Sequence, residues 1–145
     1  MFAPNAGEPA GPIAKIASGG ELSRVALALE EALSDASESR TLVFDEIDAG
    51  LGGRAGESLG KSLRRIAQQH QVLCVTHLPQ VAAQADVHLH VSKRESGGRT
   101  ITEVRALSGA ERVDEIAAML AGEGAGSGAQ AAAVELLSNA RRTKR

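Results

Sequence analysis

Apolar residues recur at helical spacing in several segments of the chain. From Glu21 to about Leu33 they lie three or four positions apart, which predicts an amphipathic helix. The same spacing from Ala55 to Ala67 predicts another. Two further helices are expected at about Ala110–Leu120 and Ala129–Ala140, on either side of the glycine-rich stretch Gly122–Gly128.

Short apolar runs between these helices predict strands. Thr41 to Phe44 is such a run and ends in two acids, and Val72 to Thr76 is another that ends at His77. Runs of this kind are typical of central parallel strands that are buried on both faces. If the two strands are parallel neighbours, their carboxyl ends lie at the same edge of one sheet.

The second half of the chain adds a hairpin. Pro79 suits the first turn of a short helix that extends to about Ala85. Beyond it, Val87–Lys93 and Thr100–Leu107 flank Ser96-Gly97-Gly98, which is typical of a hairpin turn. The expected fold is α/β, with a mainly parallel sheet, a terminal hairpin and flanking helices.

The N-terminal segment differs from the rest. Residues 1–17 carry prolines and glycines that break both helices and central strands, so they are expected to form a connector. Residues 18–145 are expected to form one lobe, since a chain of 145 residues fits a single domain.

Composition narrows the possible functions. The chain is 43% hydrophobic but has only two Phe and no Trp or Tyr, which disfavours a stacking platform for single-stranded nucleic acid. The net charge of −2 gives no general attraction to phosphate backbones, and the basic Arg141–Arg145 is interpreted as a solvated end. No secretory segment or apolar run of membrane-spanning length is present, so we expect a cytoplasmic protein. Cys74 lies in an apolar run and is expected to be an inert thiol.

The segment Ser18-Gly19-Gly20-Glu21 opens the first predicted helix. Ser18 and Glu21 have the spacing of a capping box, in which each side chain accepts a hydrogen bond from the backbone of the other residue. Adjacent glycines at a helix N-terminus also let backbone N–H groups approach an anion. Both interpretations, a structural cap and an anion site, stay open from these residues alone.

Asp45 and Glu46 follow the first predicted strand. Adjacent acids there concentrate negative charge, which indicates a nearby cation. Asp45 can hold Mg²⁺ directly or through water, and Glu46 can orient and deprotonate a water molecule. A solvated loop start is the alternative, and Asp48 could be a turn residue or a helix cap.

Histidines are the remaining candidates for chemistry. His77 follows the second strand and would share an edge with Asp45, where its imidazole could contact a terminal phosphate, although a cap or surface role is the simpler alternative. His88 and His90 share a strand face but lack a third plausible metal ligand.

One sequence mimics a phosphate-binding loop. Ala55 to Ser62 ends in Gly-Lys-Ser, but no strand precedes it and the helical stripe of apolar residues continues through it. Lys61 is therefore expected to be a solvent-facing helix residue. Because no credible phosphate loop precedes the other motifs, the chain alone is not expected to hydrolyse ATP.

Together these segments resemble the C-terminal lobe of an ABC-type or SMC-type P-loop ATPase head. Ala17–Arg24 is similar to the signature motif, and Thr41–Glu46 is similar to Walker B. Ile47–Gly50 is similar to the D-loop, and His77 to the switch histidine.

The resemblance is strongest to the RecN family, SMC-like bacterial proteins of DNA double-strand break repair. The strings that carry it are Lys15–Arg24 and Val75–Ala82, and Asn5–Pro9 is similar to that family's lead-in to the signature. The resemblance implies a cytoplasmic location, at the bacterial nucleoid.

The resemblance implies roles for particular residues. Two heads would sandwich two ATP molecules, with Ser18, Gly19, Gly20 and Glu21 binding the nucleotide held by the partner head. Asp45 would serve Mg²⁺, and Glu46 would be the general base. Asp48 would contact the partner head at the nucleotide, and His77 would sense the terminal phosphate.

The resemblance also implies partners. They are the N-terminal Walker A lobe of the same protein, a second head in an ATP-dependent dimer, and double-stranded DNA through the full-length protein, with no membrane. Two other interpretations stay open: a fragment of an ABC transporter nucleotide-binding domain, which usually has Gln where Glu21 stands, and a non-catalytic interaction module.

Overall fold

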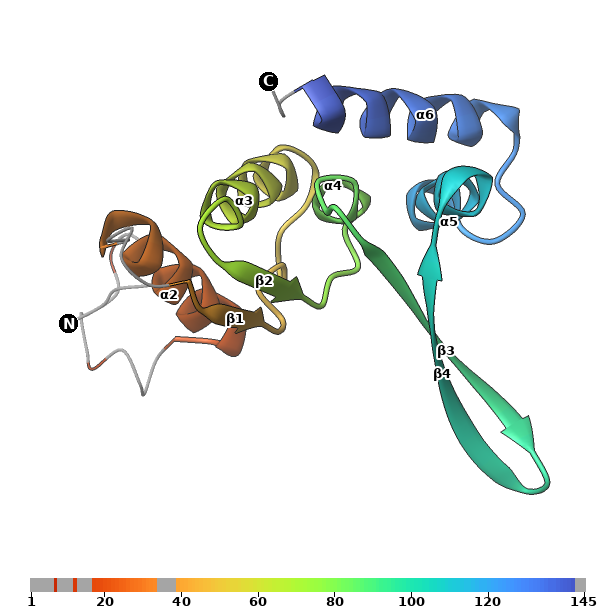
Figure 1. Ribbon diagram of the computed structural model, residues 1–145, viewed down its shortest axis with the longest axis horizontal. Helices are drawn as coiled ribbons and strands as arrows, with labels where there is room; N and C mark the ends of the chain where they lie inside the picture. The colour runs from red at the N-terminus through yellow and green to blue at the C-terminus, as the bar shows by residue number, and fades with distance from the viewer. Residues whose placement is uncertain (1–6, 8–11, 13–16, 34–38, 143–145) are drawn as a thin grey trace. The chain divides into compact units, whose positions relative to one another are not determined.

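The computed structural model of the chain describes residues 7, 12, 17–33 and 39–142 (Figure 1). Most of the predicted connector at 1–17 lies outside the described residues, as do most of Lys15–Ala17 and Asn5–Pro9. The chain divides into two compact units, Met1–Val81 and Ala82–Arg145, and each is described by itself.

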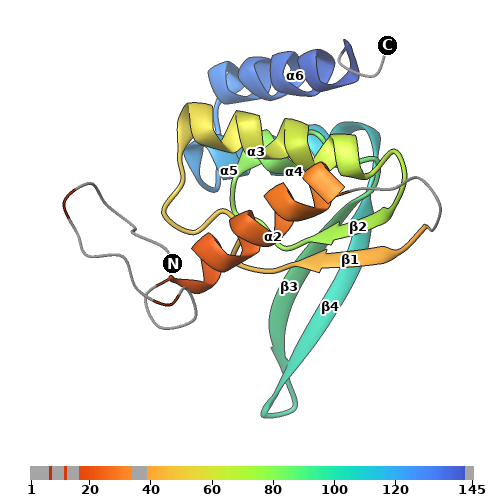
Figure 2. The same ribbon diagram turned by 90° about the vertical axis from the view of Figure 1, so that its left-hand side faces the viewer.

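The first unit pairs two short strands beneath two helices. Its strands run parallel, with Thr41 opposite Gln71 and Phe44 opposite Cys74. Helices α2 and α3 lie on the same face of this pair (Figure 2). The elements in chain order are α2 (Gly19–Leu33), β1 (Thr41–Phe44), α3 (Gly53–Ile66), β2 (Gln71–Cys74) and the short α4 (Pro79–Ala82).

A compact apolar core holds this unit together. Phe44 from β1 packs with Leu27 of α2 and with the stripe of α3 that the periodicity predicts. Each of these side chains leaves water on folding, which stabilises the unit by roughly 1.5–3 kcal/mol per fully buried large apolar side chain. The buried members are Leu27, Phe44, Ile47, Leu59, Leu63, Ile66, Leu78 and Val81.

The prediction that both strands are buried on both faces was wrong for the described residues. Alternate residues of β1 and β2 face the core, while Val43 is 68% exposed, Leu73 46% and Val75 64%. Side chains alternate across a strand, so only one face of this pair is covered by α2 and α3. An apolar face is left bare.

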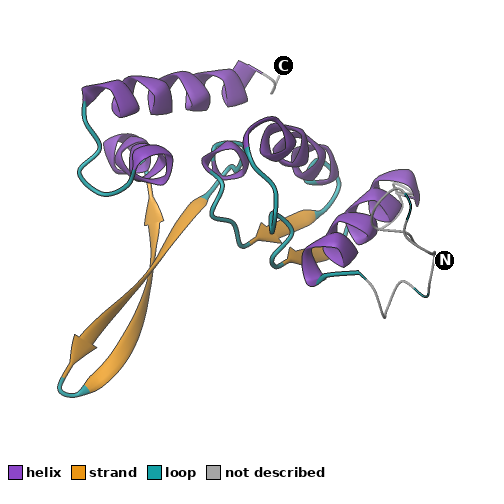
Figure 3. Cartoon of the chain, turned by 180° about the vertical axis from the view of Figure 1, so that it is seen from behind, coloured by secondary structure: helices purple, strands orange, loops and turns teal. Residues whose placement is uncertain are grey.

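The second unit is a hairpin with two helices (Figure 3). The strands β3 (His88–Ser96) and β4 (Arg99–Leu107) are antiparallel, with Ser96 opposite Arg99. Gly97 and Gly98 both have positive φ, 57° and 73°, as the two central residues of a type I′ turn require, and glycine adopts such angles readily. Helices α5 (Gly109–Ala121) and α6 (Ser127–Arg142) complete the unit.

Small side chains let these helices pack closely. Ile116 and Ala117 of α5 and Ala133 of α6 are at most 1% exposed. At the end of β4, Leu107 is also buried. The glycine-rich segment between α5 and α6 has positive φ at Gly122 and Gly124, which ends α5 as the sequence predicted.

The fold class is α/β, and the predicted order of helices and strands is confirmed. The expected mainly parallel sheet is met only by β1 and β2, because the longer ladder, β3 and β4, is antiparallel and forms a separate sheet. In the described part of the chain, no helix combines the length and apolar character that crossing a membrane requires.

Candidate functional site

The N-terminus of α2 is a complete capping box, as predicted. The backbone N–H of Glu21 donates to Ser18 Oγ at 3.3 Å, and the backbone N–H of Ser18 donates to Glu21 Oε2 at 2.7 Å. Hydrogen bonds from the Ser18 backbone, and then from its hydroxyl, hold the pKa of the Glu21 carboxyl below its ordinary value. The Glu21 carboxylate is thus engaged within the helix start, whereas the N–H groups of Gly19 and Gly20 have no acceptor inside the helix.

Where α2 meets the loop after β1, the packing leaves no room for a side chain at Gly20 and little room at Gly19. A Cβ on Gly20 would lie 2.7 Å from the backbone oxygen of Glu46 and 3.0 Å from Ala49 Cβ. A Cβ on Gly19 would lie 3.1 Å from Glu46 Oε2. The signature-like turn and the acid after β1 are therefore in direct contact within one unit.

Asp45 and Glu46 are exposed at the carboxyl end of β1. Asp45 Oδ1 accepts the backbone N–H of Glu46 at 2.9 Å. Glu46 has a φ of 53°, a left-handed conformation that costs a non-glycine residue on the order of 1 kcal/mol or more and is concentrated at functional sites. Both acidic residues are therefore exposed to solvent at this end of the strand.

The carboxylates of this edge fit a cation only in part. Within the described ranges no group of three or more His, Cys, Asp or Glu side chains could hold a metal ion. Mg²⁺ commonly binds through one or two carboxylates while phosphates and water supply the other ligands. Asp45 therefore suits an ion that arrives with a phosphate ligand, since the part of the chain that the structure describes forms no metal site from protein ligands alone.

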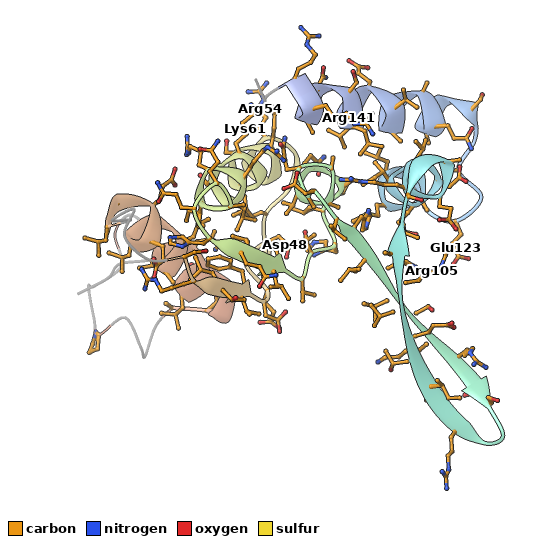
Figure 4. All side chains as sticks on the ribbon, in the orientation of Figure 1. Asp48, Arg54, Lys61, Arg105, Glu123 and Arg141 are labelled. Atoms are coloured by element: carbon orange, nitrogen blue, oxygen red, sulfur yellow. The ribbon has the colours of Figure 1, made fainter. Side chains whose placement is uncertain are left out.

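Asp48 is buried beneath the same edge, at 2% exposure, near the carboxyl end of β2 (Figure 4). Its Oδ2 accepts the backbone N–H of His77 at 2.9 Å and the hydroxyl of Thr76. Burial raises the pKa of this carboxyl, but the hydrogen bonds from Thr76 and His77 outweigh burial, so the pKa lies below its ordinary value. Asp48 therefore makes hydrogen bonds within its own chain, and the expected contact with a partner head stays a prediction.

His77 lies at the edge that the sequence predicted, because β1 and β2 are parallel neighbours. Its ring Nδ1 is 3.2 Å from Asp48 Oδ2, while the side chain is 69% exposed. The imidazole thus has one nitrogen against the buried carboxylate and the other available to a ligand in solvent.

Sequence reasoning missed the side chains that tie the loops to α2. Arg24 Nη1 donates to the backbone oxygens of Ile47 at 3.1 Å and Ala49 at 3.0 Å, and Ser23 Oγ donates to the oxygen of Asp45 at 3.1 Å. Both lie in the signature-like string, but no local pattern indicates an acceptor more than twenty residues away.

Lys61, His88 and His90 were the remaining candidates. Lys61 lies within α3 and pairs with Glu57 at 2.7 Å, as expected for a solvent-facing helix residue, and is labelled in Figure 4. His88 is half-buried, and burial followed by the nearby Arg112 lowers its pKa. His90 Nε2 lies 3.5 Å from Glu115 Oε2.

The curated proteins that this chain resembles include RecN proteins from several bacteria. The chain is 48% identical over 145 residues to the DNA repair protein RecN of Treponema pallidum and 52% identical over 143 residues to that of Mycobacterium leprae. These matches cover 100% and 99% of this chain but only 25% and 24% of the relatives. RecN of Halalkalibacterium halodurans is 52% identical over 81% of this chain and 21% of its own length. No family model matches the chain.

A solved chain from work on "ATP-driven dimerization and DNA stimulated activation of SMC ATPases" is similar to 73% of this chain, with 63% of its own length covered, a TM-score of 0.49 and 26% identity. The assignment rests on the sequence relatives instead, of whose length this chain spans about a quarter. On the strength of these matches, which cover 81–100% of its length, the chain belongs to the RecN family.

Proposed function

We propose that this chain supplies the signature, Walker B, D-loop and switch-histidine part of the ATP-hydrolysing head of a RecN-like DNA repair protein. The observation that carries the proposal is the contact between the Gly19–Gly20 turn and Glu46, at an edge that also presents Asp45 and His77. The RecN relatives, which are 48–52% identical, support the same conclusion.

Bound Mg-ATP would supply the reacting phosphate together with an ion that neutralises its charge. Asp45 would coordinate that ion, and the exposed Glu46 carboxylate would accept a proton from the attacking water. The N–H groups of Gly19 and Gly20, at the positive end of α2, would bind the phosphate held by a second head. His77 would contact the terminal phosphate through its outward nitrogen.

The same proposal accounts for the bare face of the β1–β2 pair. Exposed Val43, Leu73 and Val75 form an apolar surface that is costly to leave in water. We assign it to the Walker A lobe of the same protein, so that the two strands become part of a larger, mainly parallel sheet. A second head and double-stranded DNA, contacted by the full-length protein, complete the proposed assembly.

A substitution at Ser18 can distinguish its role in binding a phosphate from its role in capping α2. Asp is as good an N-cap as Ser, so Ser18→Asp keeps α2 folded but puts a negative charge where a phosphate would bind. In the complete head we expect Ser18→Asp to retain the parent's helicity and melting temperature and to lose ATP-dependent dimerisation, followed by analytical ultracentrifugation. Ser18→Thr, a cap without the charge, is the matched control.

Hydrolysis gives the second arm of this test. Glu46→Gln should slow ATP turnover by the complete head roughly 10²- to 10⁴-fold while ATP binding is retained, because only the proton acceptor is lost. Parent-like dimerisation by Ser18→Asp together with parent-like turnover by Glu46→Gln would contradict the proposal and favour an interaction module.

A further inference from the structure

We propose that Asp48 is a positioning residue that holds the imidazole of His77 with Nδ1 against its carboxylate and Nε2 toward the ligand side. The inference deepens the proposed function and rests on it for the identity of the ligand. It gives Asp48 an intramolecular role through His77, in place of a direct contact with nucleotide or with a second head.

The geometry at Asp48 Oδ2 fixes His77 at two points. The same oxygen accepts the backbone N–H at 2.9 Å and lies 3.2 Å from ring Nδ1. Holding both the backbone and the ring restricts the rotation of the side chain about its first torsion angle. Because a carboxylate oxygen only accepts, a hydrogen bond at this distance requires the proton on Nδ1, which leaves Nε2 unprotonated in the neutral ring.

Asp48 is itself held from two sides. The hydroxyl of Thr76 donates to Asp48 Oδ2 and accepts the backbone N–H of Leu78 at 3.0 Å, which joins the carboxylate to the segment that carries His77. On the other side, Arg24 of α2 donates to the carbonyls of Ile47 and Ala49, the two neighbours of Asp48. The loop cannot shift without breaking hydrogen bonds to α2.

Exposure distinguishes the two members of the pair. The side chain of Asp48 is 4% exposed, whereas that of His77 is 69% exposed. A ligand in solvent therefore reaches the imidazole and not the carboxylate. Burying an ionised carboxylate without donors is costly, so the donors from Thr76 and His77 are what allow the charge to remain there.

The first test reads the tautomer of His77 in this chain. Long-range ¹H–¹⁵N spectra of the imidazole, recorded where the ring is neutral, should show the Nδ1–H form of His77 in the parent. In Asp48→Asn we expect that form to decrease in favour of Nε2–H, since the carboxylate acceptor is gone. Asp114→Asn, the same change at an exposed residue bonded to the Gln130 side chain at 3.2 Å, should leave the His77 spectrum unchanged.

The second test reads catalysis in the complete head. Asp48→Asn should lower kcat for ATP roughly 10- to 100-fold, by analogy with the cost of removing the carboxylate that orients a metal-binding histidine. The KM for ATP should stay within about twofold, because His77 is proposed to act on the transition state, and losing an interaction made only there lowers kcat and kcat/KM equally. A raised KM with unchanged kcat would overturn the proposal, since it would mean that Asp48 contacts the nucleotide.

Two substitutions of Thr76 show whether an effect of Asp48→Asn could come from misfolding. Thr76→Ser keeps the hydroxyl that bonds Asp48 and should retain both the His77 tautomer and kcat, whereas Thr76→Val should lose both. An unchanged tautomer in Asp48→Asn and in Thr76→Val would overturn the proposal whatever the head's activity. If the parent head fails to hydrolyse ATP, the proposed function fails, while the spectra still decide the pairing of Asp48 with His77.

Discussion

At Asp48, burial and hydrogen bonding act on the pKa in opposite directions. Burial raises the pKa of this carboxyl, but the hydrogen bonds from Thr76 and His77 lower it by more than burial raises it. The folded chain therefore favours the charged carboxylate. At the adjacent Cys74, burial and the nearby charges act in the same direction. Burial, followed by the charges of Asp48 and Asp45, raises the pKa of that thiol to about 11. Two neighbouring groups thus respond to one environment in opposite ways.

The stability of the chain should depend on the ionisation of Asp48. Its pKa is lower in the folded than in the unfolded chain, where the ordinary value is 3.8. Its contribution is therefore complete above about pH 5 and is lost as the pH falls through the folded pKa, because the unfolded chain binds the proton more readily. The difference in unfolding free energy between the parent and Asp48→Asn, from urea denaturation, should shrink over that range. A difference that grows toward acid would contradict this.

Cys74 should be unreactive while the chain is folded. With a thiol pKa of about 11, the thiolate is scarce at pH 8. Modification by a disulfide reagent should be roughly 100-fold or more slower than for the same chain unfolded in urea. Fast modification of the folded chain, with its circular dichroism spectrum retained, would show that the thiol is more accessible than its half-buried position indicates.

At the scale of elements, α2 acts through its contacts with the loop after β1. The helix start rests on Glu46 and Ala49 at Gly20, and one turn later Arg24 donates to two carbonyls of the same loop. Since that loop continues to Asp48, the signature-like helix and the segment of His77 are joined by hydrogen bonds and close packing. The capping box and the contacts with the loop thus both stabilise the N-terminal end of α2.

Replacing Gly19 or Gly20 with alanine should show that α2 tolerates a side chain at Gly19 but not at Gly20. Gly20→Ala places a Cβ against a backbone oxygen that cannot rotate away, so the free energy of unfolding should fall by roughly 1–3 kcal/mol. Gly19→Ala meets only the end of the flexible Glu46 side chain, and it should leave that free energy unchanged or slightly raised, since Ala favours helix. Thermal unfolding followed by circular dichroism compares the two, and equal losses would contradict the packing described.

At the scale of the whole molecule, the uncovered face of the β1–β2 pair is the feature that indicates a larger assembly. The core side of each strand is packed as in a finished domain, yet Val43 and Val75 are more than 60% exposed. The chain also spans about a quarter of the length of its RecN relatives. Both facts agree with a sheet that other parts of the protein complete.

Val43→Lys should weaken association without unfolding the chain. Val43 is 68% exposed, so its replacement should change the free energy of unfolding by no more than about 0.5 kcal/mol. Burying the ammonium against the Walker A lobe should weaken binding at least about tenfold, measured by calorimetry with the separately purified lobe. Val134→Lys, at a residue of α6 that is 53% exposed, is the control, and equal binding by both variants would contradict the assignment of this face.

Local sequence determined the elements of this protein. The cap at Ser18, the stripe of α3 and the Gly97–Gly98 turn depend on residues within a few positions of one another, so periodicity and turn chemistry identify them. The order of acids and histidine after two apolar runs also indicated the site, since parallel strands bring their carboxyl ends to one edge.

Only the tertiary structure decided how the site is held. Asp48 reaches Thr76 and His77 across 28 and 29 positions, and Arg24 reaches the loop carbonyls across 23 and 25. Such contacts depend on the path of the backbone between them, which no local pattern encodes. The same reason explains the bare side of β1 and β2: an apolar run shows that a strand can be buried on two faces, but which face is covered depends on what packs there.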